Sequence, residues 1–96
     1  MSPLKRKKLN KIRLKLDKLD NSLIKLIKQR TNLVNQVLQL KDKKKEIIDN
    51  KRIKIILKNI RKKSLANKID PKITNRIWKN MIWSYIDYEK RNFKKK

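Results

Sequence analysis

A heptad repeat of apolar residues between positions 9 and 41 constrains the fold of this chain more than any other feature. One series consists of Ile12, Leu19, Leu26, Leu33 and Leu40, and the other of Leu9, Leu16, Leu23 and Val37. Apolar residues that recur every seven positions line one side of an α-helix. The repeat therefore predicts a long helix that packs along this seam against other helices. No strand-like alternation competes with it, so we predict an all-α fold.

One position of the second series holds Arg30 instead of an aliphatic residue. A guanidinium on a buried stripe is costly to desolvate unless an anionic group meets it there. Lys41 follows eleven residues later, three turns along the same face of the expected helix. The two cations suggest a gap in the core that holds an anion. Alternatively, the seam is imperfect and Arg30 extends to the helix edge, as long cationic side chains often do.

The composition excludes several kinds of chemistry. The 96 residues include no Cys, His or Gly, so disulfides, thiol nucleophiles, imidazole acids or bases and glycine-rich phosphate loops are excluded. The lack of Cys and His also removes most zinc sites, and we expect no metal. No apolar run approaches the roughly 20 residues that cross a bilayer, and the N-terminus lacks the apolar segment of a secretory signal. We therefore expect a cytoplasmic protein that does not contact a membrane.

The charge is strongly positive, with 31 Lys and Arg against 8 Asp and Glu and a formal net charge of +23. Such a charge attracts any polyanion or small anionic metabolite, so it does not identify the partner. Basic ends and aromatic residues near Lys and Arg would also fit a small helical nucleic-acid-binding protein. That alternative does not explain cations inside the apolar seam, and we do not expect nucleic acid as a partner.

Start and stop signals predict three helices within a single domain, residues 1–96. The first is expected from about residue 4 or 9 to about residue 44, after a frayed basic extension, residues 1–8. The charged cluster that begins at Lys41 indicates a turn within residues 41–50. The second, residues 50–67, follows Asp49, which is a good N-cap. The third, residues 71–93, has Asp70 as its N-cap and Pro71 at its first position, and a basic tail, residues 94–96, follows.

The length of the first helix predicts a homodimer or larger oligomer. At 1.5 Å per residue, this helix makes a rod of roughly 55–60 Å. A compact chain of 96 residues has a diameter of only roughly 32 Å. The rod cannot be buried within one chain, so we expect at least two copies of the protein to share it.

Three further charged residues draw attention. Glu89 continues a stripe of large apolar groups, four residues after Tyr85. Arg52 lies in a first helical turn, where a cation opposes the helix dipole. Arg13 lies four residues before Asp17 on the first helix, so an ion pair between the two would be an alternative explanation for it. Similarly, Glu89 could be a surface acid near a frayed helix end. Since no nucleophile has a base beside it, the set suits a reaction that needs only binding and charge placement, such as a unimolecular rearrangement of a dianion.

Four motifs together have a recognisable spacing: Arg30 and Lys41 eleven residues apart, Asp-x-x-Arg at the start of the second helix, Asp-Pro at the start of the third, and an acid near its end. On these motifs the chain resembles the all-helical chorismate mutases. The resemblance extends over the strings LDKLDNSLIKLIKQRTNLVNQVLQLK, IIDNKR and IDPKITNRIWKNMIWSYIDYE.

The resemblance implies three helices per chain in an intertwined homodimer, in which the long first helices pair and each active site borrows one Arg from the partner subunit. It implies an isomerase of phenylalanine and tyrosine biosynthesis. Chorismate would become prephenate by a Claisen rearrangement, without a cofactor or a covalent intermediate. Isochorismate pyruvate lyase, which has the same fold and nearly the same cations, is the closest alternative.

The resemblance also implies roles for individual residues. Arg30 matches the Arg that binds a substrate carboxylate in the middle of the first helix. Arg13, seven residues before Asp20, matches the Arg that is donated to the partner's site. Asp49 and Arg52 match the Asp-x-x-Arg motif that closes the site at the second helix.

Two more matches concern the ether oxygen of the substrate. Lys41 corresponds to the Lys that hydrogen-bonds this oxygen as the C–O bond breaks, and Glu89 to the second donor, a Gln or Glu in the family. The chain departs from the family pattern at Ile53, where a Glu often contacts the substrate hydroxyl. It departs again at Tyr85, where a small hydroxyl residue is common. Either Tyr85 or the adjacent Ser84 would face the substrate.

Overall fold

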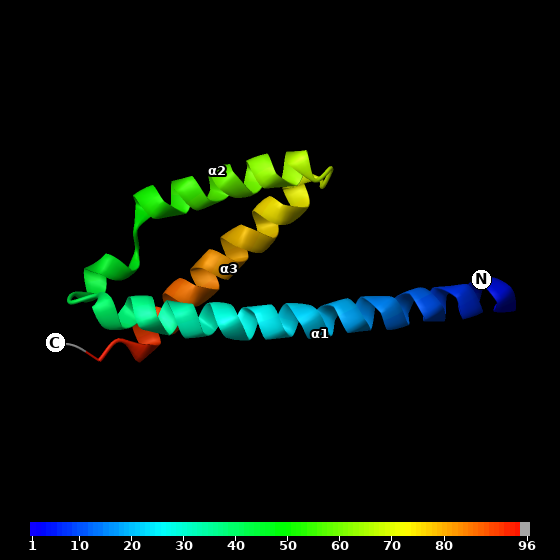
Figure 1. Ribbon diagram of the computed structural model, residues 1–96, viewed down its shortest axis with the longest axis horizontal. Coiled ribbons are helices and arrows are strands. Elements are labelled where there is room, and N and C mark those ends of the chain that lie inside the picture. Colours follow the sequence, from blue (N-terminus) through cyan, green and yellow to red (C-terminus); the bar gives the residue numbers. More distant parts are fainter. Residues whose placement is uncertain (95–96) are drawn as a thin grey trace. The chain divides into compact units, whose positions relative to one another are not determined.

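The computed structural model describes residues 1–94 and consists of helices and short connections (Figure 1). The elements are α1 (Pro3–Leu40), the 3₁₀ helix η1 (Lys44–Ile47), α2 (Asn50–Ala66) and α3 (Pro71–Asn92). Residues 1–94 contain no strand, so the predicted all-α fold with three long helices is confirmed. Lys95 and Lys96 of the predicted basic tail lie outside the described residues. The chain comprises two compact units, Met1–Leu33 and Val34–Lys96.

α1 begins earlier than expected, because Ser2 and Pro3 form a helix start. The Ser2 hydroxyl accepts a hydrogen bond from the backbone N–H of Lys5 at 3.2 Å, and the Ser2 carbonyl accepts one from the N–H of Arg6 at 2.9 Å. A serine cap satisfies an otherwise unpaired N–H, and proline has the helical φ angle already. The expectation that residues 1–8 fray was therefore wrong.

α1 also ends earlier than expected, at Leu40 instead of residue 44. Lys41 lies just beyond the helix, where its N–H donates to the carbonyl of Leu38 at 3.2 Å. The chain then turns into η1, whose Glu46 carboxylate accepts from the N–H of Lys43 at 3.0 Å. Ile47 at the end of η1 is only 3% exposed. The predicted turn within residues 41–50 is confirmed, but the sequence contains no Gly or Pro here to mark where the helix stops.

The starts of α2 and α3 agree with the prediction. The Asp49 carboxylate accepts a hydrogen bond from the backbone N–H of Arg52 at 3.0 Å. The Asp70 carboxylate accepts one from the N–H of Lys72 at 2.9 Å, and Pro71 opens the helix. Both N-caps are confirmed, and each helix ends one residue before the predicted position, at Ala66 and Asn92.

The core lies within the unit Val34–Lys96, between the end of α1, η1, α2 and α3. Its buried apolar residues are Leu38, Ile47, Ile82 and Ile86, with Ile48, Ile53, Ile56, Leu57 and Phe93 packed against them. These four buried side chains form a small core for a chain of this length. The α2 residues that face it, Ile53, Ile56 and Leu57, recur at helical spacing.

In the unit Met1–Leu33 most of the heptad seam is exposed in the single chain. Leu16 and Leu23 are each 53% exposed, Leu26 is 57% exposed and Leu19 is 61% exposed. A continuous apolar stripe of this kind is normally covered by another helix.

Within residues 1–94, no helix is both long enough and apolar enough to cross a membrane.

The turn after α2 supplies a test of the backbone. The N–H of Ile69 donates to the carbonyl of Ser64 at 2.8 Å, and the N–H of Lys68 donates to the carbonyl of Leu65 at 3.2 Å. These two bonds define a Schellman motif, in which the residue with left-handed backbone angles is usually Gly. Here Lys68 takes that position, with φ of 57°. We predict that Lys68→Gly raises the free energy of unfolding by about 1 kcal/mol, because the left-handed conformation is strained for a residue with a Cβ.

Denaturant titration followed by circular dichroism measures this change. The matched control is Lys54→Gly within α2, which should lower stability by about 1 kcal/mol because Gly is a poor helix former. Equal losses in the two variants would contradict the prediction.

Candidate functional site

The candidate site centres on an ion pair between Lys41 and Glu89. The Lys41 ammonium donates a hydrogen bond to Oε1 of Glu89 at 3.3 Å, and the two side chains are 18% and 8% exposed. Lys41 follows the last residue of α1, whereas Glu89 lies near the end of α3. The pair therefore joins residues 48 positions apart in the sequence.

Glu89 lies on the core side of α3. It follows Ile82 by seven residues and Ile86 by three, and these two residues are 7% and 6% exposed. Residues with this spacing share one face of a helix, so the carboxylate continues an apolar stripe. The alternative that Glu89 is a surface acid at a frayed end was wrong, since α3 continues to Asn92 and Glu89 is only 6% exposed.

A second polar link joins α1 itself to α3. The Tyr88 hydroxyl donates a hydrogen bond to Oδ1 of Asn35 at 2.8 Å, across 53 positions of sequence. The ring of Tyr85 packs edge-on against that of Tyr88, with centroids 6.5 Å apart and planes at 88°. Sequence patterns alone do not single out Asn35 or Tyr88. Asn35 is an amide on the first helix and Tyr88 is a hydroxyl residue next to Glu89, but neither residue shows from the sequence that it pairs with the other.

The predicted Asp49–Arg52 motif lies beside Lys41. Lys41 and Asp49 line one open cavity of about 470 Å³, together with Glu46, Ile48, Asn50 and Lys51. The Asp49 carboxylate caps α2 by accepting from the backbone of Arg52. The Arg52 side chain is exposed, so a small anion could reach its guanidinium directly from solvent.

The residues that depart from the family pattern have distinct environments. Ile53 is half-buried and packs against the core, which leaves no polar group at this position for a substrate hydroxyl. Ser84 is exposed, and its hydroxyl donates to the backbone carbonyl of Asn80 at 2.7 Å. Tyr85 is half-buried beside Tyr88. Of the two hydroxyl residues considered, Tyr85 therefore lies on the side of α3 nearer to Glu89.

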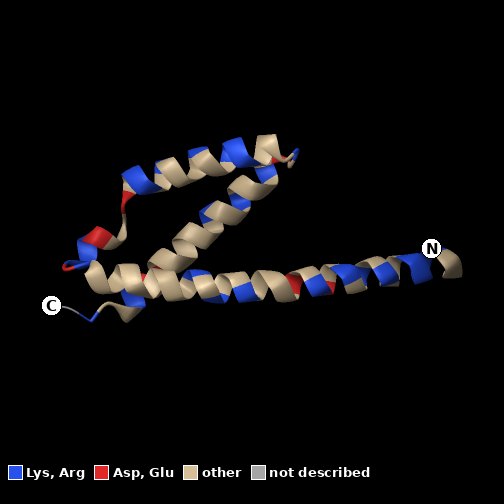
Figure 2. Cartoon of the chain, in the orientation of Figure 1, with Lys and Arg blue, Asp and Glu red and all other residues tan. Residues whose placement is uncertain are grey.

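Arg13 and Arg30 belong to the other unit, Met1–Leu33, and are described from that unit alone. Both lie on α1, where Lys and Arg recur along the helix (Figure 2). Arg13 is exposed, whereas Arg30 is half-buried. Within the unit Val34–Lys96, the structure brings together Lys41, Asp49 and Glu89.

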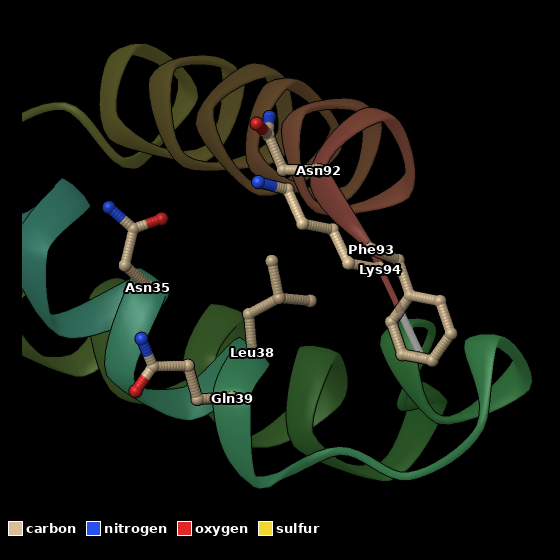
Figure 3. A pocket seen from close by; sticks show the side chains of 6 residues that line it. All are labelled: Asn35, Leu38, Gln39, Asn92, Phe93 and Lys94. Carbon is tan, nitrogen blue, oxygen red and sulfur yellow. The ribbon is translucent and has the colours of Figure 1, made fainter. Parts of the chain in front are cut away.

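A further cavity of about 330 Å³ lies between the ends of α1 and α3 (Figure 3). It is lined by Asn35, Leu38, Gln39, Asn92, Phe93 and Lys94. Its polar groups are mainly carboxamides, and none of the predicted site residues lines it. Asn35 is common to this cavity and to the hydrogen bond with Tyr88.

The described residues offer no cluster of three His, Cys, Asp or Glu side chains that could hold a metal ion. The polar groups described at the site are the ammonium of Lys41, the guanidinium of Arg52, two carboxyl groups and two phenols. Such groups can bind an anion and place charge or hydrogen-bond donors, without forming a covalent intermediate.

Comparisons with known proteins support one family. The family model described as Chorismate mutase type II matches residues 12–90. The matched region begins within α1, ends within α3 and includes every residue of the candidate site. Comparisons with curated proteins and with solved structures gave no match.

The buried pair supplies a test of stability. We predict that Lys41→Met lowers the free energy of unfolding by about 3 kcal/mol, because it leaves the Glu89 carboxylate buried without its cation. The double variant Lys41→Met/Glu89→Met should recover most of that loss, since it removes both charges. Urea titration of the variants at one protein concentration measures these changes.

The matched control is the exposed ion pair between Arg91 and Asp87, whose side chains are 65% and 69% exposed. Arg91→Met should change stability by less than about 1 kcal/mol. Equal effects of Lys41→Met and Arg91→Met would show that the Lys41–Glu89 pair is not an energetically important contact.

Proposed function

The chain belongs to the chorismate mutase type II family, and on that premise we propose that it is an isomerase that converts chorismate to prephenate in phenylalanine and tyrosine biosynthesis. The observation that carries the proposal is the Lys41–Glu89 pair, which combines two potential hydrogen-bond donors in a largely buried setting. The reaction is a unimolecular rearrangement of a dianion, so the protein needs to supply only binding and charge placement.

Cations bind the substrate in the proposed mechanism. Arg30 binds one carboxylate of chorismate, and an Arg is suited to this because its planar guanidinium can grip a carboxylate with two hydrogen bonds. Asp49 and Arg52 close the site at the start of α2. Chorismate is flexible, and binding selects the compact chair in which the atoms that form the new C–C bond meet. The protein thereby lowers the entropic part of the barrier.

Lys41 and Glu89 act on the ether oxygen. In the transition state the C–O bond lengthens and negative charge grows on this oxygen. A donor that meets the oxygen stabilises the transition state more than the ground state, which is the condition for a higher rate. Glu89 can donate only in its protonated form. The Lys41 ammonium donates as it stands and lies beside Glu89, 3.3 Å away.

The proposal includes an intertwined homodimer. Each chain forms a single mutase domain and donates Arg13 to the partner's site. The homodimer is supported by the exposed seam of α1, on which Leu16, Leu19, Leu23 and Leu26 are each more than half exposed. Pairing of two such seams would bury these side chains. Each buried leucine would then contribute roughly 1.5–3 kcal/mol relative to an exposed one.

Turnover of chorismate tests the proposed function. Loss of chorismate absorbance should follow addition of the protein, and Lys41→Ala should lower kcat by about 10²–10³-fold, because it removes a donor to the developing charge. Arg30→Ala should abolish measurable turnover at any salt concentration. Arg91→Ala is the matched control, since it removes an exposed cation from α3.

A parallel assay with isochorismate distinguishes the mutase from the lyase on the same fold. Release of pyruvate from isochorismate, with no loss of chorismate, would contradict the mutase proposal. Turnover that depends only on salt, and equally on Arg30 and Arg91, would contradict a specific site.

The role of Glu89 as the second donor predicts the effect of replacing it. Glu89→Gln should keep most of kcat, because a carboxamide also donates a hydrogen bond to the ether oxygen. Glu89→Ala should lower kcat by about 10²–10³-fold, because it removes the donor. Steady-state kcat of the two variants tests the prediction, and an equal loss in both would exclude Glu89 as a donor.

A further inference from the structure

The hydrogen bond between Tyr88 and Asn35 joins α3 to the last turns of α1 immediately beside the proposed catalytic pair. Tyr88 precedes Glu89 in the chain, and its hydroxyl lies 2.8 Å from Oδ1 of Asn35. Both residues are half-buried. Asn35 precedes Leu38 of the core by three residues and Lys41 by six. The Tyr88–Asn35 bond and the Lys41–Glu89 pair therefore both connect the end of α3 to residues 35–41.

The Lys41–Glu89 pair does not by itself hold its partners in a fixed orientation. Lys41 lies outside α1, on a side chain with four rotatable carbons, and its contact with Glu89 is 3.3 Å long. An ammonium is a point charge that accepts many directions of approach. α3 packs mainly against α2 and η1, so contacts between side chains decide where its end lies relative to the end of α1.

The phenol–amide bond supplies the missing constraint. Tyrosine has only two rotatable side-chain bonds, and the edge-on contact with Tyr85, at 6.5 Å between ring centroids, restricts the Tyr88 ring further. Asparagine is short, so its amide follows the backbone of α1 closely. A hydrogen bond between two such groups is directional and fixes the backbone of α3 one residue from Glu89.

From this geometry we infer that Tyr88 and Asn35 are positioning residues for the proposed rearrangement: their hydrogen bond holds the Glu89 carboxyl in register with Lys41, so that both donors meet the ether oxygen. The inference rests on the proposed function. Neither residue touches the reacting atoms in this account. Their loss affects the rate through the alignment of Glu89, since small displacements of a donor weaken transition-state stabilisation strongly.

The test uses two single variants and their combination. Tyr88→Phe removes only the hydroxyl and Asn35→Leu removes the acceptor at similar volume. Each should lower kcat about fivefold, the scale of one hydrogen bond, with KM changed less than twofold. The double variant should lose no more than either single variant, because both act through one bond. Asp87→Asn, which removes an exposed ion-pair partner one residue before Tyr88, is the matched control and should leave kcat unchanged.

The effect of Tyr88→Phe in a protein that already lacks Glu89 separates a positioning role from a general structural role. In a Glu89→Ala protein there is no carboxyl to align, so adding Tyr88→Phe should not lower kcat further. The same fivefold loss in that background would overturn the inference. Circular dichroism establishes that each variant is folded, and Asn35→Leu carries the test if Tyr88→Phe does not fold.

The outcomes also separate the two proposals. A wild-type protein without chorismate turnover would overturn the proposed function and the positioning role together. An active wild type whose kcat is unaffected by Tyr88→Phe and by Asn35→Leu would overturn the positioning role alone.

Discussion

The burial of a carboxyl group among isoleucines is the constraint on which the described site depends. Glu89 shares one face of α3 with Ile82 and Ile86, and all three side chains are less than a tenth exposed. A carboxylate at such a position is strongly unfavourable unless a cation or donor meets it. Lys41 meets it, and for this reason the residue that follows α1 lies against the end of α3. The local environment excludes most of the solvent, so charge–charge and hydrogen-bond interactions here are stronger than in water.

The chain by itself buries few apolar side chains in a core. In the part of the chain that the structure describes, the buried apolar residues are only Leu38, Ile47, Ile82 and Ile86. Meanwhile the seam of α1 exposes a continuous row of leucines. A heptad seam of this kind is normally covered by another helix, and the proposed dimer would cover it with the same seam of a second copy. The proposed sharing of Arg13 rests on the resemblance to the family, in which each site takes one Arg from the partner subunit.

Local sequence signals gave most of the helical framework. Asp49 and Asp70 cap their helices as predicted, because a carboxylate at an N-cap meets N–H groups only two or three residues away. The start of α1 at Pro3 is one residue before the earlier of the two predicted positions, but the expected fraying of residues 1–8 was wrong because Ser2 caps the helix. The turn within residues 41–50 was also predicted. The helix before it ends at Leu40, about four residues earlier than expected, since residues 41–45 contain no Gly or Pro to mark the boundary.

By itself, the sequence determined the helical class, the two capped helix starts, the apolar seam and the family, because each of these depends on residues close together in the chain or on a fixed spacing. It also identified Lys41 and Glu89 as charged residues out of place. Only the tertiary structure decided that these two meet, and that Tyr88 meets Asn35, across 48 and 53 residues respectively. No periodicity encodes such a pairing, since it depends on how α3 folds back against α2 and η1 and on where α1 ends.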